Sequence, residues 1–278
     1  PIDSSNMNPD NWVEIANIIE DKYSFYDGII VLHGTDTMAY TASALSFMLE
    51  NLNKAIILTG SQIPIGARRT DAKENLITAV EIAVSEKVNE VCIYFEDKLY
   101  KGNRTVKVNT EHFEAFESPN YPILGEAGVN IKYGSILQKK GNQELVVHKN
   151  CSDDVAILKL FPGIKLTSIE AIIKNSKGIV IESFGGGNAS TNPNFTALLS
   201  KAMYEGKIII NISQCLHGEA VRGQYETNEP FEKAGVICGK DMTTEAAITK
   251  LMFLLGQGLS NEEIKTQLQK NLRGEISN

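Results

Sequence analysis

Short apolar segments recur along the first half of the chain, and each leads through polar residues into a stretch with helical spacing of its apolar positions. These segments are rich in Val, Ile and Leu and show no polar alternation, which is typical of strands covered on both faces. They cover residues 28–32, 55–58 and 91–95. The helical stretches cover residues 11–22, 38–51 and 76–84. Strands that alternate with helices in this way predict a parallel sheet.

The alternation stops in a polar, charged segment that contains glycine, and it then starts again. We expect a domain boundary at this segment, with a first domain over 1–134, a linker over 135–153 and a second domain over 154–278. The fold class is therefore α/β, with two domains whose parallel-rich sheets are flanked by helices. The strands expected in the second domain are 155–160, 178–181 and 207–210, and the helices are 166–174 and 193–205.

Composition narrows the classes of function. The chain of 278 residues carries 34 acidic and 27 basic side chains, so a surface dedicated to nucleic acid, which is usually basic, is not expected. It has no run of 18 apolar residues that would span a membrane, and its first residues show no signal-peptide pattern. The four cysteines are widely spaced, as reduced thiols often are. We expect a cytoplasmic protein that binds neither nucleic acid nor membranes.

The richest polar motif is HGTDT at residues 33–37, directly after the first expected strand. Ligands of parallel sheets bind beyond the carboxyl ends of the strands, so chemistry is expected here. One interpretation is helix capping, because Thr and Asp before a helix satisfy its first backbone amides. The other is a site in which Thr35 activates a water, while Asp36 orients a partner or binds a substrate ammonium. The motif alone leaves both interpretations open.

Lys107 lies in the polar stretch 98–122, which is longer than a simple connection. A single lysine is usually a solvated surface charge, whereas a buried amine of lowered proton affinity can act as a base. The segment SFGGGN at 183–188 lacks a complete GxGxxG motif and indicates a tight turn rather than a nucleotide site. The four histidines show no metal-ligand spacing, and no GxSxG is present. We expect neither a metal nor another cofactor, and the absence of GxSxG weakens an interpretation as a serine hydrolase.

Several segments together resemble the bacterial type I, cytoplasmic L-asparaginases. They are HGTDTMAYTASALSFMLENL, TGSQIP, NRTVKV with FEAFESPN, GKDMTTEAAITKL and QNLRGE. The resemblance implies a larger N-terminal domain and a smaller, Rossmann-like C-terminal domain. It also implies sites at the strand ends of the first domain that a neighbouring subunit completes, and hence a homodimer or homotetramer. The polar segment 223–228 is our candidate for reaching the neighbour.

The same resemblance implies roles for individual residues. Thr35, Asp36 and Lys107 match the catalytic Thr-Asp-Lys set of the family, and we expect the Lys107 amine to lie near Thr35, shielded from water. Asp3, Ser4 and Ser5 match the segment that holds the α-carboxylate and α-amine of asparagine, and Thr35 and Asp36 add contacts to the substrate.

Two features depart from the family pattern. The family's nucleophilic threonine lies in a TGGTIG motif, and residues 1–278 contain none. We therefore expect the nucleophile to lie upstream of Pro1, the first domain to be truncated here, and residues 1–278 alone to release no ammonia. In addition, Glu182 occupies a position where enzymes regulated by asparagine carry an arginine, and Asn188 and Cys215 match other parts of that allosteric pocket. A carboxylate there would repel the carboxylate of an effector.

These expectations describe an amidohydrolase that converts L-asparagine to L-aspartate and ammonia through a threonine acyl-enzyme. An alternative is the ammonia-releasing subunit of a Glu-tRNA amidotransferase, although the acidic composition and the absence of an extra domain do not favour it. Another alternative is a non-catalytic protein that binds an amino acid, because the nucleophile is not in these residues.

Overall fold

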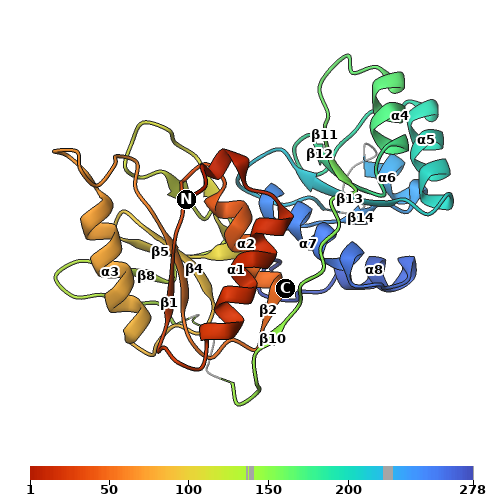
Figure 1. The fold of residues 1–278 in the computed structure, drawn as a ribbon. Coiled ribbons are helices and arrows are strands. Elements are labelled where there is room, and N and C mark those ends of the chain that lie inside the picture. Colours follow the sequence, from red (N-terminus) through yellow and green to blue (C-terminus); the bar gives the residue numbers. More distant parts are fainter. Residues whose placement is uncertain (136, 138–140, 222–227, 278) are drawn as a thin grey trace. The chain divides into compact units, whose positions relative to one another are not determined.

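The computed structural model describes residues 1–135, 137, 141–221 and 228–277. The chain divides into two compact units, Pro1–Lys149 and Asn150–Asn278, and each is described by itself. Figure 1 shows that both units combine a sheet with flanking helices. The expected fold class is confirmed.

The first unit contains, in chain order, η1 (Ser4–Asn6), α1 (Pro9–Lys22), β1 (Ile29–Leu32), α2 (Met38–Met48), β2 (Leu49–Glu50), β3 (Ile56–Thr59), α3 (Ala72–Val84), β4 (Val91–Phe95), β5 (Lys98–Lys101), η2 (Gly102–Arg104), β6 (Val106–Lys107), β7 (Phe116–Glu117), β8 (Gly125–Glu126), β9 (Lys132–Tyr133) and β10 (Val146–Val147). A six-stranded sheet has the order β1-β3-β4-β5-β8-β9. Its first three strands are parallel and the others antiparallel. Two small antiparallel pairs, β2 with β10 and β6 with β7, complete the unit.

Helices cover both faces of this sheet, with α3 on one side and α2 on the other (Figure 1). Ile57 and Cys92 are register partners in β3 and β4, and both belong to a core cluster with Ala79 and Ile82 of α3. All residues of α2 except Tyr40 are buried. The parallel strands therefore carry apolar side chains on both faces, as their continuous apolar sequence predicts.

The prediction that β1 is covered on both faces is wrong at its end. Leu32 is 67% exposed, and residues 29–31 are only half-buried. In the described part of the chain, β1 is the outermost strand and pairs only with β3. An apolar run identifies a strand, but it does not say how many neighbours that strand has.

Part of the expected linker belongs to the first unit. Val146 and Val147 pair with Glu50 and Leu49, respectively. The helix expected over 38–51 accordingly ends at Met48, and its last residues form β2 instead. The long polar stretch 98–122 is also structured, because it contains β5, η2, β6 and β7.

The second unit contains β11 (Val155–Lys159), α4 (Leu166–Lys174), β12 (Gly178–Ser183), α5 (Pro193–Tyr204), β13 (Ile208–Ser213), α6 (Glu229–Ala234), β14 (Ile237–Cys238), α7 (Thr244–Gly256) and α8 (Asn261–Leu268). Its four strands are parallel in the order β11-β12-β13-β14. One face packs against α4, α5 and α6 through a cluster that includes Ile181, Ile209, Phe195 and Phe231. Gly178 allows α7 to approach the other face, because a Cβ there would lie 2.8 Å from Leu251 and Leu255. The segment 184–188 forms the expected tight turn, with Gly187 at φ +100°.

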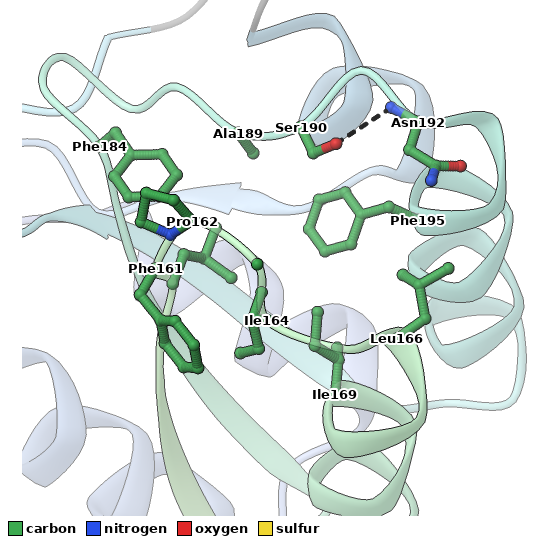
Figure 2. A pocket seen from close by; sticks show the side chains of 12 residues that line it. Phe161, Pro162, Ile164, Leu166, Ile169, Phe184, Ala189, Ser190, Asn192 and Phe195 are labelled. Atoms are coloured by element: carbon green, nitrogen blue, oxygen red, sulfur yellow. Dashed lines mark hydrogen bonds between the residues drawn. The ribbon is translucent and has the colours of Figure 1, made fainter.

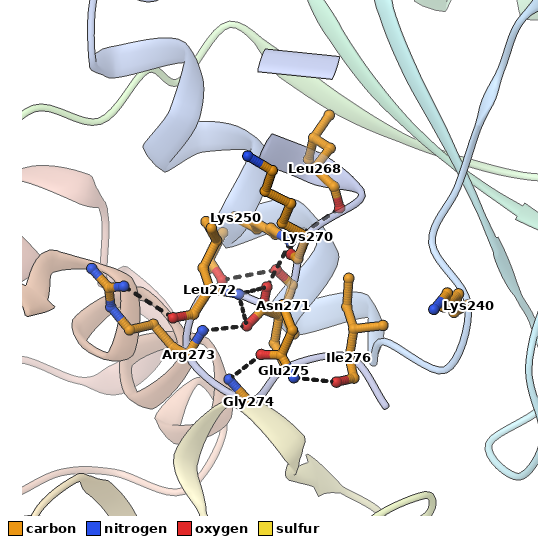
Figure 3. A network of polar contacts seen from close by, with 12 residues as sticks. Lys240, Lys250, Leu268, Lys270, Asn271, Leu272, Arg273, Gly274, Glu275 and Ile276 are labelled. Carbon is orange, nitrogen blue, oxygen red and sulfur yellow. Dashed lines mark hydrogen bonds and ion pairs between the residues drawn. The ribbon is translucent and has the colours of Figure 1, made fainter. Parts of the chain in front are cut away.

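Helix α8 ends at Leu268, and the segment NLRGE at residues 271–275 forms a turn beyond it. Figure 3 shows this turn wrapped around a buried ion pair of Lys250 and Glu275. The Lys250 ammonium also donates to the carbonyl oxygens of Leu268 and Lys270. The carboxylate of Glu275 accepts from the backbone amides of Leu272 and Arg273.

No helix within the described residues is both long and apolar enough to cross a membrane.

Candidate active site

The polar motif 33–37 begins where β1 ends, and contacts with β3 fix its entry. The backbone amide of His33 donates to the carbonyl oxygen of Thr59 at 2.9 Å. The carbonyl oxygen of His33 packs directly on Gly60, where any Cβ would overlap it. Glycine is therefore required at position 60, because the backbones of His33 and Gly60 approach each other too closely for a side chain.

Lys107 reaches this motif from β6. Its Nζ donates to Oγ1 of Thr35 at 2.7 Å and to Oδ1 of Asp36 at 2.6 Å, across 72 and 71 residues of sequence. The side chain of Lys107 is 15% exposed, whereas that of Asp36 is 62% exposed. Thr35 itself is buried. The amine thus lies next to the hydroxyl and is largely shielded from water, as expected.

Helix capping does not explain the motif. The residue that caps α2 is Thr37, and its side chain makes no capping hydrogen bond. The Thr37 hydroxyl donates instead to the carbonyl oxygen of Ser4 at 2.6 Å. The side chains of Thr35 and Asp36 are therefore available for contacts other than those with the helix amides.

Gln62, which the sequence did not indicate as a site residue, completes the surroundings of Thr35. The Thr35 hydroxyl donates to Oε1 of Gln62 at 3.1 Å, and Nε2 of Gln62 donates to the carbonyl oxygen of His112 at 3.1 Å. Asp71 fixes the loop by accepting from the backbone amides of Gln62 and Ile63. The only available signal was the position of TGSQ after a parallel strand, which does not single out one side chain.

Ser4 connects the N-terminal segment to the same loop. Ser4 is buried, and a Cβ on Gly34 would lie 2.6 Å from its Oγ. Asp3 and Ser5 are exposed and hydrogen-bond to each other, with Oδ1 of Asp3 accepting from Ser5 N at 2.9 Å and from Ser5 Oγ at 2.5 Å. These bonds from the Ser5 hydroxyl and amide lower the pKa of Asp3, so its carboxylate is ionised at neutral pH.

This arrangement is suited to proton transfer at a hydroxyl group. The Thr35 oxygen lies between an amine and an amide, and the amine has a carboxylate beside it. An amine at hydrogen-bond distance can exchange a proton with the hydroxyl or with a water in its place. Among the described residues, no group of three His, Cys, Asp or Glu side chains is arranged to hold a metal ion.

Both halves of the chain match models of one family. Residues 1–138 match the asparaginase N-terminal domain, and residues 154–268 match the glutaminase/asparaginase C-terminal domain. The chain belongs to the asparaginase family.

Individual relatives in this family are similar over nearly the whole chain. L-asparaginase 1 of Escherichia coli strain K12 is 44% identical over 99% of this chain and 82% of its own length. The 60 kDa lysophospholipase of Mus musculus is 45% identical over 99% of this chain and 49% of its own length. The crystal structure of L-asparaginase I from Vibrio cholerae superimposes with a TM-score of 0.94 at 43% identity, covering 99% of this chain and 84% of that one.

The second unit of this asparaginase-family chain holds the three residues expected to form an allosteric pocket. Glu182, Asn188 and Cys215 all lie at the carboxyl ends of β12 and β13. The Glu182 side chain already has partners, because Oε1 accepts from the Thr244 hydroxyl at 2.6 Å and Oε2 lies 3.4 Å from Nζ of Lys159. Cys215 is exposed.

A separate hollow of about 360 Å³ lies beside the carboxyl ends of β11 and β12 (Figure 2). Its lining is mainly aromatic and aliphatic and carries no charged side chain. Figure 2 shows Phe184 and Phe195 on opposite sides of it. The segment 223–228, which we expected to reach a neighbouring subunit, lies outside the described residues except for Asn228.

Proposed function

We propose that the protein hydrolyses the side-chain amide of L-asparagine to L-aspartate and ammonia. The observation that carries this proposal is the contact of Lys107 with both Thr35 and Asp36 in a chain of the asparaginase family. Relatives named L-asparaginase support the choice of substrate. No metal or other cofactor takes part in the proposed reaction.

The proposed chemistry has two steps, each with a threonine. A nucleophilic threonine from a TGGTIG segment outside residues 1–278 adds to the amide carbon, ammonia leaves, and an ester to the enzyme remains. Thr35 then positions a water that attacks this ester and releases aspartate. Lys107 exchanges the proton at the Thr35 oxygen, while the Asp36 carboxylate stabilises the charged amine.

The proposed substrate contacts come from both ends of the site. The exposed carboxylate of Asp36 binds the α-ammonium group of asparagine together with Asp3, while Ser4 and Ser5 lie beside its α-carboxylate. Support for this comes from Ser4, which packs on Gly34 and thereby holds η1 against the reactive loop. The ionised state of Asp3 is consistent with binding a cation.

The test is ammonia release by the complete gene product with asparagine, and in parallel with glutamine. Asparagine should be the better substrate, and T35V and K107M should each lower kcat by on the order of a hundredfold or more, as expected for proton-transfer groups. K101M is no control, because Lys101 forms a buried pair with Glu90. The exposed pair of Lys233 and Glu229 offers K233M as a matched control, which should keep full activity.

Other outcomes would point to other functions. Activity with glutamine alone, dependent on a tRNA-binding partner, would favour the amidotransferase subunit. Hydrolysis of a lysophospholipid without ammonia release would favour the activity named in the mouse relative. Tight binding of asparagine without turnover would favour the binding protein. Equal activity with and without the threonine of a TGGTIG segment would contradict the assigned nucleophile.

We further propose a cytoplasmic homodimer or homotetramer whose sites are completed across subunits. The fully free thiols of its four cysteines are consistent with a reducing compartment. Sedimentation of the complete gene product tests the assembly, and a stable monomer of full activity would contradict it. We also propose that asparagine does not act as an effector at Glu182, Asn188 and Cys215, because the carboxylate of Glu182 would repel it.

A further inference from the structure

Next to the HGTDT motif at residues 33–37, side chains from three separate segments form a chain of hydrogen bonds. The indole Nε1 of Trp12, on α1, donates to Oγ1 of Thr41, on α2, at 3.0 Å. That oxygen lies 2.9 Å from Nε2 of His33. At the other side of the ring, Nδ1 of His33 lies 2.6 Å from the carbonyl oxygen of Gly34. Trp12 and Thr41 are 6% and 0% exposed, so water does not compete for these partners.

The donor and the acceptor at the two ends of this hydrogen-bond series determine where the protons of the Thr41 hydroxyl and the His33 ring lie. A carbonyl oxygen only accepts, so Nδ1 of His33 carries hydrogen. An indole N–H only donates, so the Thr41 oxygen accepts from Trp12 and its own hydrogen is left for Nε2 of His33. Burial lowers the pKa of His33, more than the bond to Gly34 raises it, which favours the uncharged ring. His33 is therefore the neutral tautomer with hydrogen on Nδ1.

This bond controls the orientation of the peptide that precedes Thr35. The Gly34–Thr35 peptide is planar, so a fixed Gly34 oxygen also fixes the direction of the Thr35 amide and Cα. On its other side Gly34 packs on Ser4, where an added Cβ would lie 2.6 Å from Oγ. Before it, the His33 backbone is held by Thr59. The peptide cannot rotate without breaking one of these contacts.

We propose that His33 is a positioning residue for the reaction: with its tautomer set by Thr41 and Trp12, it fixes the Gly34–Thr35 peptide and so holds the Thr35 hydroxyl on Lys107. The proposal rests on the proposed amidohydrolase function. His33 acts here through the backbone, and its ring nitrogens are both engaged by partners other than Thr35 and Lys107. The first residue of the HGTDT motif thereby has a role that is separate from proton exchange.

The first test uses T41V and T41S in the complete gene product. Valine keeps the shape of the side chain but removes the hydroxyl, whereas serine keeps the hydroxyl. In ¹⁵N NMR of histidine-labelled protein, the wild type and T41S should show hydrogen on Nδ1 of His33, with the signal assigned by its loss in H33N. T41V should show a mixture of tautomers. Its kcat for asparagine should fall by on the order of tenfold to a hundredfold, since displaced reacting groups have effects of this size, and T41S should stay close to wild type.

A second pair of variants separates the two contacts of the ring and does not depend on the folding of T41V. In H33N the amide group lies where Nδ1 lies and can still donate to Gly34. In H33Q the longer side chain places its amide at the Nε2 position, next to Thr41, and leaves Gly34 without a donor. We expect H33N to keep most of the kcat and H33Q to lose on the order of tenfold or more, with similar melting temperatures for the two.

The readouts separate failure of this proposal from failure of the proposed function. Hydrogen on Nε2 in the wild type, or a charged ring at neutral pH, would overturn the hydrogen-bond chain whatever the enzyme hydrolyses. A mixed tautomer in T41V with unchanged kcat, or H33Q more active than H33N, would overturn the positioning role. Absence of ammonia release by the wild type would overturn the proposed function, and the positioning role that rests on it, while the NMR result would still decide the tautomer.

Discussion

The ammonium group of Lys250 and the carboxylate of Glu275 lie 2.6 Å apart, and neither side chain has any exposed surface. Lys250 is on α7 and Glu275 is in the turn after α8, so the pair ties the end of the described chain to a helix that packs on the sheet. The backbone amides and carbonyls around the pair satisfy its remaining hydrogen-bonding groups. Such a pair is tolerated in a core only while both charges are present.

Removing one charge of this pair should destabilise the protein strongly. K250M leaves the carboxylate of Glu275 buried without its counter-charge, and we expect a loss of about 3–5 kcal/mol in the free energy of unfolding. The matched control is K265M, because Lys265 forms a pair of the same length with Glu262, which is 83% exposed. The loss of unfolding free energy in K265M should stay below about 1 kcal/mol. Urea unfolding measures both, and equal losses would contradict the role assigned to the buried pair.

Glu245 should make the stability depend on pH near neutrality. Its Oε2 is buried without a hydrogen-bond partner, and burial raises its pKa from 4.5 to about 7, with a further contribution from the Glu182 carboxylate. Between these two values the folded state binds more protons than the unfolded state, so stability falls as the pH rises. Well above pH 7 Glu245 is ionised in both the folded and the unfolded state, so stability falls no further.

The variant E245Q removes this titration. We expect E245Q to be more stable than the wild type at pH 8, by on the order of 2–3 kcal/mol, and the difference to shrink toward zero as the pH falls to 4. Unfolding in urea at pH 4, 6 and 8 measures it. E262Q, at a highly exposed position, is the matched control. A difference between E245Q and the wild type that is the same at every pH would show that Glu245 does not titrate in this range.

Gly60 and Gly66 lie in the same loop but should respond differently to alanine. A Cβ at Gly60 would overlap the His33 carbonyl oxygen, whereas nothing lies within 4 Å of a Cβ at Gly66. We expect G60A to lower the stability by about 1–3 kcal/mol and to reduce ammonia release, since it moves the residue before Gly34. G66A should leave both unchanged. Normal activity of G60A would show that the loop accommodates the displacement elsewhere.

The partners of Glu182 lead to a prediction about kinetics. Because its carboxylate accepts from Thr244 and faces Lys159, we expect a hyperbolic dependence of rate on asparagine concentration. Repulsion of an effector carboxylate by on the order of 1 kcal/mol would lower its affinity several-fold. Steady-state rates of the wild type and C215S should therefore have the same shape. A sigmoidal curve that C215S abolishes would show that a pocket at these residues binds an effector.

Most of the fold was predictable because the buried parallel strands are continuous apolar runs. The contact between Thr35 and Lys107 was predictable from the family resemblance and not from strand order, because Lys107 lies on β6, after β5, which runs antiparallel to β4. Gln62 was not, because a single glutamine in a loop has no periodicity or spacing that marks it. Its contact with Thr35 depends on Asp71 holding the loop backbone, a relation that the sequence does not display.

The environment of charged residues was the least predictable part. Lys250 sits in the apolar sequence AAITKLMFLL, where a lysine would usually extend to solvent. Its burial depends on a carboxylate 25 residues later and on a turn whose carbonyl oxygens point inward. Likewise, the partners of Glu182 come from β11 and α7. Pairings over such separations follow from packing of the completed fold.

Helix α2 has a consequence for how this family member can diversify. The helix begins just after Asp36 and carries Thr41. Its Ala42 also packs on Gly102, where an added Cβ would lie 3.1 Å from the Cβ of Ala42. Gly102 precedes Lys107 by five residues, so one buried helix supports both the loop with Thr35 and Asp36 and the segment with Lys107. A substitution on α2 that changes its volume therefore shifts the reactive groups relative to each other. Substitutions in the exposed loops leave this support in place, so side chains there can vary without displacing Thr35 or Lys107.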